Sequence, residues 1–319
     1  MEIPAGARPA IVVRAHGKFY EAQLEDGRIL LATVRGLLRR ERRRTDLVAV
    51  GDRVWVSDVG EGEGQIEAIE LRTRSLARRA RLTEDTEQII LANPDQALFL
   101  FAVREPEPHL RMLDRFLVLA ESRQLPAAIG VNKMDLDGPT EDGAPSLARS
   151  LFGHYEGIYP VFYLGARTGR GIDDLKAFLL GKITAVAGPS GVGKSSLLNV
   201  LDPDGRRDVA AISGATGKGR HTTTATVLRR IPAEAPTFVA DTPGIRALSL
   251  QGVAPDELDE LFPEFRDVLD RCFYPDCSHL HEPGCAVREA VEDGRISPQR
   301  YESYAALRRG DEPRFSSSA

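Results

Sequence analysis

The sequence has few cysteines, no long apolar run and no large excess of charge. It contains only three cysteines in 319 residues, and an odd number argues against the disulfide framework of a secreted domain. No apolar run approaches the roughly 20 residues that cross a bilayer, and the first residues lack the hydrophobic stretch of a signal peptide. We therefore expect a cytosolic protein with no membrane segment, and nothing in the sequence demands more than a monomer.

The net charge of −5 does not indicate a nucleic-acid-binding protein as a whole, but arginines gather in two places. Val34 to Arg44 contains six arginines and one glutamate, and Arg72 to Arg81 contains five more arginines. Either cluster alone is equally well explained as solvated surface. Two clusters near the start of an otherwise acidic chain favour a partner with a phosphate backbone.

The first part of the chain is typical of a small β-barrel. Five β-branched or alternating segments are separated by glycine-containing turns, and this pattern favours the five-stranded OB fold. The segments are residues 10–16, 18–24, 28–34, 47–59 and 64–71. The first arginine cluster connects the third and fourth segments. The alternative is a barrel that serves only as a spacer.

From about residue 86, short apolar runs alternate with amphipathic helices, as in a parallel sheet covered on both faces. From about residue 250 the pattern is helical and polar. We therefore expect a multidomain chain with an OB-fold RNA-binding domain at residues 1–80, an α/β P-loop domain at 81–250 and a helical metal-binding domain at 251–319.

A phosphate-binding loop is predicted in the α/β domain. The segment "GPSGVGKS" matches G-x-x-x-x-G-K-[ST], follows an apolar strand and precedes a helix. Glycines let backbone N–H groups close around phosphate oxygens, Lys194 reaches the β- and γ-phosphates, and Ser195 ligates Mg²⁺. The predicted loop is Gly188, Pro189, Ser190, Gly191, Val192, Gly193, Lys194, Ser195 and Ser196.

Two further motifs follow apolar strands and belong to the same site. In "DTPG", Asp241 would hold Mg²⁺ and the Gly244 N–H would sense the γ-phosphate. In "NKMD", Asp135 would accept two hydrogen bonds from guanine and so reject adenine. Asn132 would brace the loop, and Lys133 would lie along the base. Met134 is the remaining residue of the predicted base loop. A weaker second base loop begins at Leu164, where the Ala166 N–H would meet the guanine oxygen, although Gly165 stands where serine is usual.

The order of these motifs is that of a GTPase rotated along the chain. The base loop comes first, and the phosphate loop and DTPG come after it. A parallel sheet tolerates this rotation because the ends of a domain commonly lie close together at its surface.

The three cysteines predict a metal site. The spacing Cys272-x4-Cys277-x-His279-x5-Cys285 offers three thiolates and one imidazole, a closed set that suits structural Zn²⁺. His281 is the rival imidazole. Zinc would organise a segment too polar to fold alone.

The chain resembles the circularly permuted GTPases, and among them the RsgA (YjeQ) family of small-ribosomal-subunit biogenesis GTPases. The segments "ANPDQALFLFAV", "VNKMDL", "GPSGVGKSSLLN", "GRHTTT", "DTPGIR" and the cysteine cluster carry the resemblance. It implies hydrolysis of GTP with Mg²⁺, one structural Zn²⁺ held through His279, and action on the 30S subunit in late maturation. It also implies contact with 16S rRNA through the basic barrel and the C-terminal domain.

Hydrolysis is expected to be slow without a partner, because Ile245 stands where many GTPases have a glutamine that orients water. The segment Gly219 to Thr224 looks like a first switch, in which Thr223 is the favoured threonine ligand of Mg²⁺. The resemblance suggests His221 as the group that positions water, so the predicted catalytic residues are His221, Lys194 and Thr223. The alternatives are that His221 is an exposed or RNA-contacting residue, and that Arg220 stabilises charge or contacts phosphate.

The same residues argue against two other functions. A P-loop ATPase or kinase would show no preference for guanine, and NKMD argues against it. An RNA-binding module with a vestigial nucleotide site is disfavoured by the intact Lys194, Ser195 and Asp241.

Overall fold

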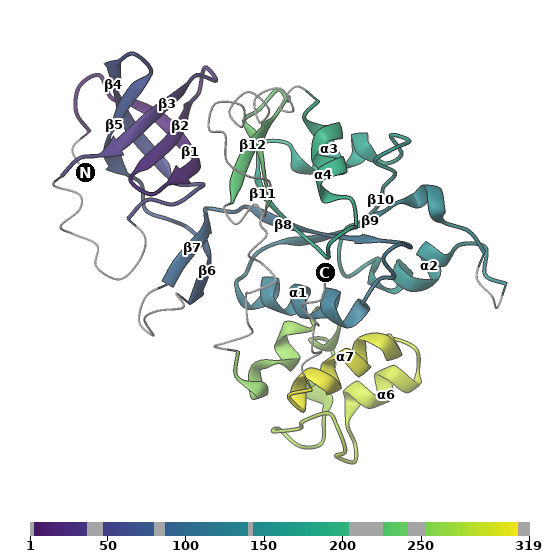
Figure 1. The fold of residues 1–319 in the computed structure, drawn as a ribbon. Coiled ribbons are helices and arrows are strands. Elements are labelled where there is room, and N and C mark those ends of the chain that lie inside the picture. Colours follow the sequence, from purple (N-terminus) through teal and green to yellow (C-terminus); the bar gives the residue numbers. More distant parts are fainter. Residues whose placement is uncertain are drawn as a thin grey trace.

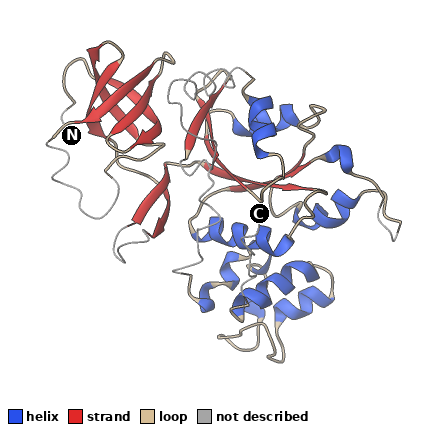
Figure 2. Ribbon diagram, in the orientation of Figure 1, coloured by secondary structure: helices blue, strands red, loops and turns tan. Residues whose placement is uncertain are grey.

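The computed structural model describes residues 3–36, 47–79, 87–139, 143–203, 226–241 and 253–311. Three parts follow one another along the chain in Figure 1: a β-barrel, a central sheet with helices on both faces, and a small helical module coloured green to yellow. The barrel and the helical module contact different sides of the central part, and Figure 2 shows that strands dominate the first and helices the last.

The N-terminal barrel has the five strands expected from the sequence. They are β1 (Arg8–His16), β2 (Phe19–Leu24), β3 (Ile29–Val34), β4 (Arg53–Gly60) and β5 (Glu63–Ile69). The barrel closes in the order β1-β2-β3-β5-β4, with β3 and β5 parallel. Alternate residues of β5 are buried, as the period of two requires. The five-stranded barrel is confirmed, while most of the first arginine cluster, residues 37–44, lies outside the described residues.

The central sheet has the order β10-β9-β8-β11-β13-β12. Its strands are β8 (Gln96–Ala102), β9 (Ala127–Asn132), β10 (Val161–Tyr163), β11 (Ile183–Ala187), β12 (Val227–Ile231) and β13 (Thr237–Asp241). Neighbours are parallel except for β12 and β13. The strand β11 lies at the centre although it is fourth along the chain, which is the arrangement that a rotated chain order requires.

Helices cover both faces of this sheet, so its strands are apolar on both sides. One face packs against α1 (Leu110–Ser122) and α2 (Leu147–Phe152), and the other against α3 (Ile172–Leu179) and α4 (Lys194–Leu201). Along β8, Phe99 and Phe101 enter the first core while Leu98 and Leu100 enter the second. Every residue of β8 and β11 is buried, which explains the continuous apolar runs in the sequence.

Two features were not expected from the sequence. The strand β12 carries two arginines and runs antiparallel at the sheet edge. A separate hairpin of β6 (Ser75–Arg79) and β7 (Glu87–Ala92) follows the barrel, where the sequence showed mainly a basic cluster. Neither β12 nor the hairpin shows the unbroken apolar pattern on which the predictions of the central strands were based.

The C-terminal module consists of four short 3₁₀ turns followed by two helices. The turns are Pro255–Glu257, Asp259–Leu261, Pro263–Phe265 and Leu269–Arg271, and the helices are α6 (Ala286–Glu292) and α7 (Pro298–Arg308). Val118 of α1 belongs to the core of this module, so α1 is shared between the module and the central sheet. Within the described ranges, no helix is long and apolar enough to cross a membrane.

A buried arginine fastens the module to α1. Arg300 of α7 is completely buried, and it donates to Asp114 of α1 at 2.7 Å and to Glu264 at 2.6 and 3.1 Å. Tyr155 donates to the same Asp114 oxygen at 2.7 Å. Burial alone would lower the pKa of Arg300, but the two carboxylates raise it above its ordinary value. The guanidinium therefore stays charged inside the interface.

We expect Arg300→Ala to loosen this interface, because it leaves two buried carboxylates without their cation. Hydrogen–deuterium exchange should show that the free energy of opening of α7 falls by about 3–5 kcal/mol. The matched control is Arg295→Ala, which removes an exposed pair with Asp293 and should change it by no more than about 1 kcal/mol. Equal effects of the two variants would show that Arg300 does not hold the module in place.

Candidate nucleotide site and metal centre

The strands that precede the predicted nucleotide-binding loops end at one edge of the central sheet. The strands β9, β10, β11 and β13 form a parallel set with β8, so their carboxyl ends lie on the same side. Ligands of open α/β sheets bind at this side. The NKMD, second base, phosphate and DTPG segments each follow one of these four ends.

Asn132 joins three of these loops directly. Its side chain is 2% exposed, and its Nδ2 donates to the Val192 carbonyl at 2.8 Å. Its Oδ1 accepts from the Ala166 N–H at 3.3 Å. One amide group therefore connects the base loop, the phosphate loop and the second base loop, although these segments stand in a rotated order along the chain.

The phosphate loop has the close packing that its glycines predict. A Cβ on Gly188 would lie 2.0 Å from the Leu100 carbonyl oxygen, and a Cβ on Gly193 would lie 2.4 Å from Asn132 Nδ2. Gly193 has a φ of 94° and caps α4, which begins at Lys194. The Lys194 ammonium donates to the carbonyls of Gly188 and Pro189 at 3.0 and 2.7 Å. It therefore lies within the curve of the loop, while Ser195 and Ser196 are exposed at the helix start.

The base loop turns sharply after β9. Lys133 has a φ of 61°, and the Met134 N–H donates to the Leu164 carbonyl at 3.1 Å. Met134 is buried while Asp135 is exposed. The Lys133 ammonium donates to the Glu105 carbonyl, so the segment between β8 and α1 also borders this site.

The structure explains the glycine at position 165. A Cβ at Gly165 would lie 2.2 Å from Thr168 Oγ1, so the threonine hydroxyl occupies the space of the usual serine side chain. Sequence reasoning did not single out Thr168, because its effect on Gly165 depends on the turn between them.

The remaining predicted residues lie at or beyond the described part. Asp241 ends β13 beside β11 and is partly exposed. His221, Thr223, Arg220 and Gly244 lie outside the described residues, so their roles stay predictions.

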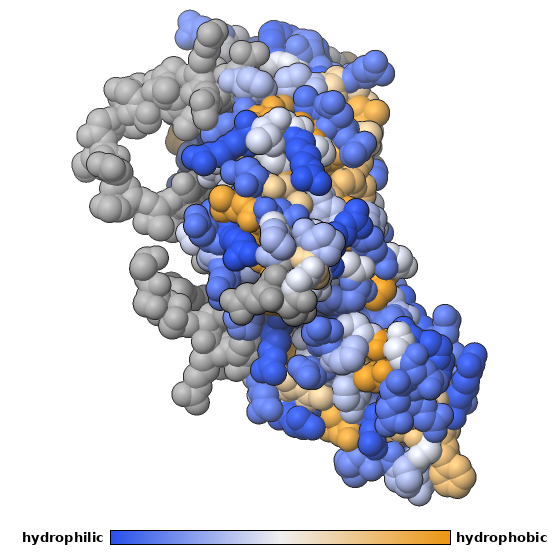
Figure 3. Space-filling view, turned by 90° about the vertical axis from the view of Figure 1, so that its right-hand side faces the viewer, coloured by the Kyte–Doolittle hydropathy of each residue, from blue (hydrophilic) through white to orange (hydrophobic). Residues whose placement is uncertain are grey.

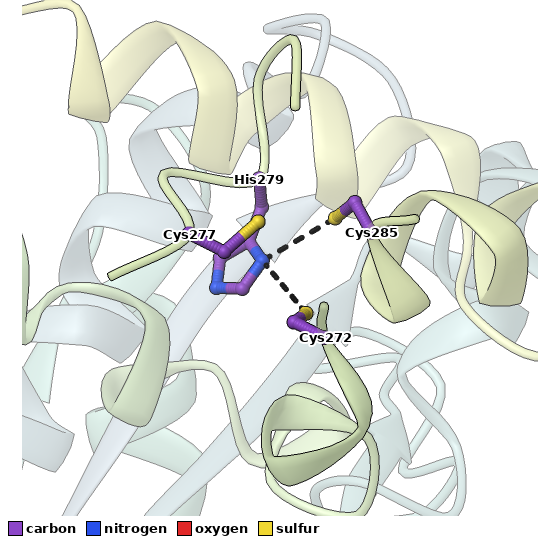
Figure 4. Close-up of side chains that lie close together, drawn as sticks. All are labelled: Cys272, Cys277, His279 and Cys285. Carbon is purple, nitrogen blue, oxygen red and sulfur yellow. Dashed lines mark hydrogen bonds between the residues drawn. The ribbon is translucent and has the colours of Figure 1, made fainter. Parts of the chain in front are cut away.

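The predicted metal ligands come together in the C-terminal module. The ligand atoms of Cys272, Cys277, His279 and Cys285 all lie within 4.8 Å of one another. His279 Nδ1 is 3.6 Å from Cys272 Sγ and 3.4 Å from Cys285 Sγ, as Figure 4 shows. Three sulfurs and one nitrogen at such separations fit a tetrahedral Zn²⁺ site. The side chain of His281 is 82% exposed and does not join this cluster.

Surrounding groups orient the histidine. Its Nε2 lies 3.1 Å from Asp259 Oδ2, which leaves Nδ1 as the ligand atom and is the partner usual for a metal-bound imidazole. Burial alone would raise the pKa of Asp259, but hydrogen bonds, first that with His279, hold it below its ordinary value. Tyr301 donates to the His279 carbonyl at 2.8 Å. Sequence reasoning missed Asp259, because no local spacing connects it to the cysteines.

The thiols need a cation in order to ionise. Burial raises the pKa of Cys277 to about 12, and burial also raises the pKa of Cys285. Three crowded thiolates without a cation would repel one another, whereas a divalent ion stabilises the thiolate form. The donor set thus fits Zn²⁺.

Comparison with known proteins adds the family. The model of the RsgA GTPase family matches residues 69–251. A small ribosomal subunit biogenesis GTPase RsgA from Gemmatimonas aurantiaca is 44% identical over 300 residues, which cover 93% of this chain and 95% of that protein. The chain belongs to the RsgA family of GTPases.

Solved structures agree with this assignment. YjeQ from Thermotoga maritima has a TM-score of 0.75 and 36% identity, covering 95% of this chain and 98% of that one. YloQ, described as a circularly permuted GTPase, has a TM-score of 0.71 and 28% identity over 98% of both chains. The barrel, the rotated order of motifs and GTP as the nucleotide of this P-loop family are thereby confirmed, which argues against an ATPase or kinase.

We expect binding of the metal to depend on His279 and not on His281. The purified His279→Ala variant should contain far less than one zinc ion per chain by elemental analysis, and His281→Ala should retain one. Asp259→Asn should weaken zinc binding by about 10–100-fold through loss of the hydrogen bond to the imidazole. Full zinc content in His279→Ala would contradict the ligand assignment.

Proposed function

We propose that this protein hydrolyses GTP at the edge formed by the four loops and thereby assists late maturation of the small ribosomal subunit in the cytoplasm. The observation that carries the proposal is the Asn132 side chain, which connects the base loop to the phosphate loop. Relatives across most of the chain are named small ribosomal subunit biogenesis GTPases, which supports the ribosomal part.

The geometry supports the base-reading roles that we assign here. Asp135, exposed at the loop tip, accepts from guanine N1–H and its amine, while Lys133 lies along the base. The Ala166 N–H makes only a long hydrogen bond of 3.3 Å to Asn132 Oδ1, and it also donates to the guanine oxygen. Asn132 itself acts as the brace between loops.

The phosphate loop and its neighbouring segments are assigned to the phosphates and to Mg²⁺. Backbone N–H groups of Gly188 to Ser196 and the start of α4 hold the phosphates, and Lys194 neutralises their charge. Ser195, Thr223 and Asp241 hold Mg²⁺, and Gly244 meets the γ-phosphate. The zinc ion is structural and closes the C-terminal module.

The RNA contact is assigned to the N-terminal part. We place the OB-fold domain at residues 1–80, the GTPase domain at 81–250 and the zinc domain at 251–319. Residues 1–80 contain fifteen Lys and Arg against twelve Asp and Glu. Arg72, Arg74 and Arg123 line a surface cavity of about 640 Å³ beside this part of the chain. These charges suit the phosphate backbone of 16S rRNA.

Asp135→Asn tests the guanine assignment. Because an amide cannot accept two hydrogen bonds from guanine, the affinity for GDP should fall by about 100-fold or more. The variant should gain affinity for xanthosine diphosphate, in which an oxygen stands in place of the exocyclic amine of guanine. Isothermal titration with both nucleotides measures this exchange, and Asp137→Asn, two residues further along, is the matched control. Unchanged GDP affinity in Asp135→Asn would contradict the assignment.

His221→Ala tests the catalytic assignment. Hydrolysis stimulated by 30S subunits should fall by about 100-fold, as expected for loss of a water-positioning group. Nucleotide affinity and 30S binding should stay unchanged. Undiminished stimulated turnover would assign His221 to another role.

A further inference from the structure

Two aromatic side chains project from the metal-binding loop. Phe273 and Tyr274 follow the ligand Cys272 and are 76% and 40% exposed. Their rings lie edge to face with centroids 4.9 Å apart. The face of the molecule in Figure 3 is mainly hydrophilic, with hydrophobic residues in small patches. Two adjacent exposed aromatic rings offer a flat surface on which a partner can stack.

The metal loop holds this pair in place. The Phe273 N–H donates to the Gly284 carbonyl at 3.0 Å, and Gly284 precedes the ligand Cys285. The Cys277 N–H donates to the Tyr274 carbonyl at 3.3 Å. The pair is thus clamped between three metal ligands, and a partner that covers it would meet a preorganised surface.

The charge of the module indicates the chemistry of that partner. Residues 253–311 contain fourteen Asp and Glu, seven Arg and no Lys, and Arg300 is buried in the interface with α1. Asp270 and Asp276, on either side of the pair in sequence, are exposed, with Arg271 as the cation between them. Three thiolates around a divalent ion add a further negative charge. This surface repels a phosphate backbone and complements a cationic protein segment, whose Lys or Arg side chains stack on aromatic rings.

We propose that Phe273 and Tyr274 dock a Lys- and Arg-rich protein segment of the small ribosomal subunit. The C-terminal module then recognises protein while the N-terminal part contacts RNA, which differs from the expectation, drawn from the resemblance, that both parts contact 16S rRNA. This inference rests on the proposed function, because the partner is part of the same subunit.

Photo-crosslinking in purified 30S subunits tests the identity of the partner. Full-length protein carrying Phe273→p-benzoylphenylalanine is bound to 30S with a non-hydrolysable GTP analogue, irradiated, and analysed by mass spectrometry and primer extension. A crosslink to a Lys- or Arg-rich segment of a ribosomal protein is expected. A crosslink to rRNA, or none from a variant that still co-sediments with 30S, overturns the inference and leaves the proposed function intact. Failure of the wild-type protein to bind 30S overturns both.

Phe273→Ala tests the contribution of the pair to binding. Because the side chain is largely exposed, zinc content and intrinsic GTP hydrolysis should not change. The dissociation constant for 30S should rise by about 5–20-fold, as for loss of an aromatic hot spot. Leu180→Ala removes an exposed apolar side chain outside both the barrel and the C-terminal module and should leave the dissociation constant for 30S unchanged. Equal 30S affinity in Phe273→Ala and wild type overturns the inference.

Discussion

The buried amide of Asn132 is the contact on which the nucleotide site depends. It connects the base loop with a phosphate loop sixty positions further along the chain. The chain order is rotated relative to that of an ordinary GTPase, but the strands reach the same edge, because the carboxyl ends of parallel neighbours coincide. What this site requires is the spatial order of the strands, with β11 between β8 and β13.

The helix α1 links that site to the metal module. Just before α1, the Glu105 carbonyl accepts a hydrogen bond from the Lys133 ammonium. The Cδ of Pro106 would lie 3.6 Å from a Cβ placed on Gly191 of the phosphate loop. The outer side of α1 contributes Asp114 to the Arg300 cluster and Val118 to the core of the module. The C-terminal module is therefore a packed extension of the GTPase domain. Its exposed aromatic pair keeps a defined position relative to the nucleotide loops.

Much of this architecture is predictable from the sequence. The barrel strands alternate with a period of two, and the central strands are short continuous apolar runs, so both kinds of strand can be recognised. The edge strand β12 escapes prediction because its arginines interrupt the apolar pattern. The choice between His279 and His281 could not be made from spacing, because both lie within reach of the cysteines along the chain. It is decided by burial and by Asp259, which approaches from a turn twenty residues away. Thr168 likewise has no local signature, and the switch residues lie outside the described ranges.

The most direct test of the account is phosphate release from GTP and from ATP, each with and without purified 30S subunits. The account predicts slow release from GTP alone, strong acceleration by 30S, and no release from ATP in either condition. Equal use of both nucleotides with no effect of 30S would contradict it. That result would leave a phosphate loop in place, but it would remove both the guanine-reading role of the NKMD segment and the ribosomal partner.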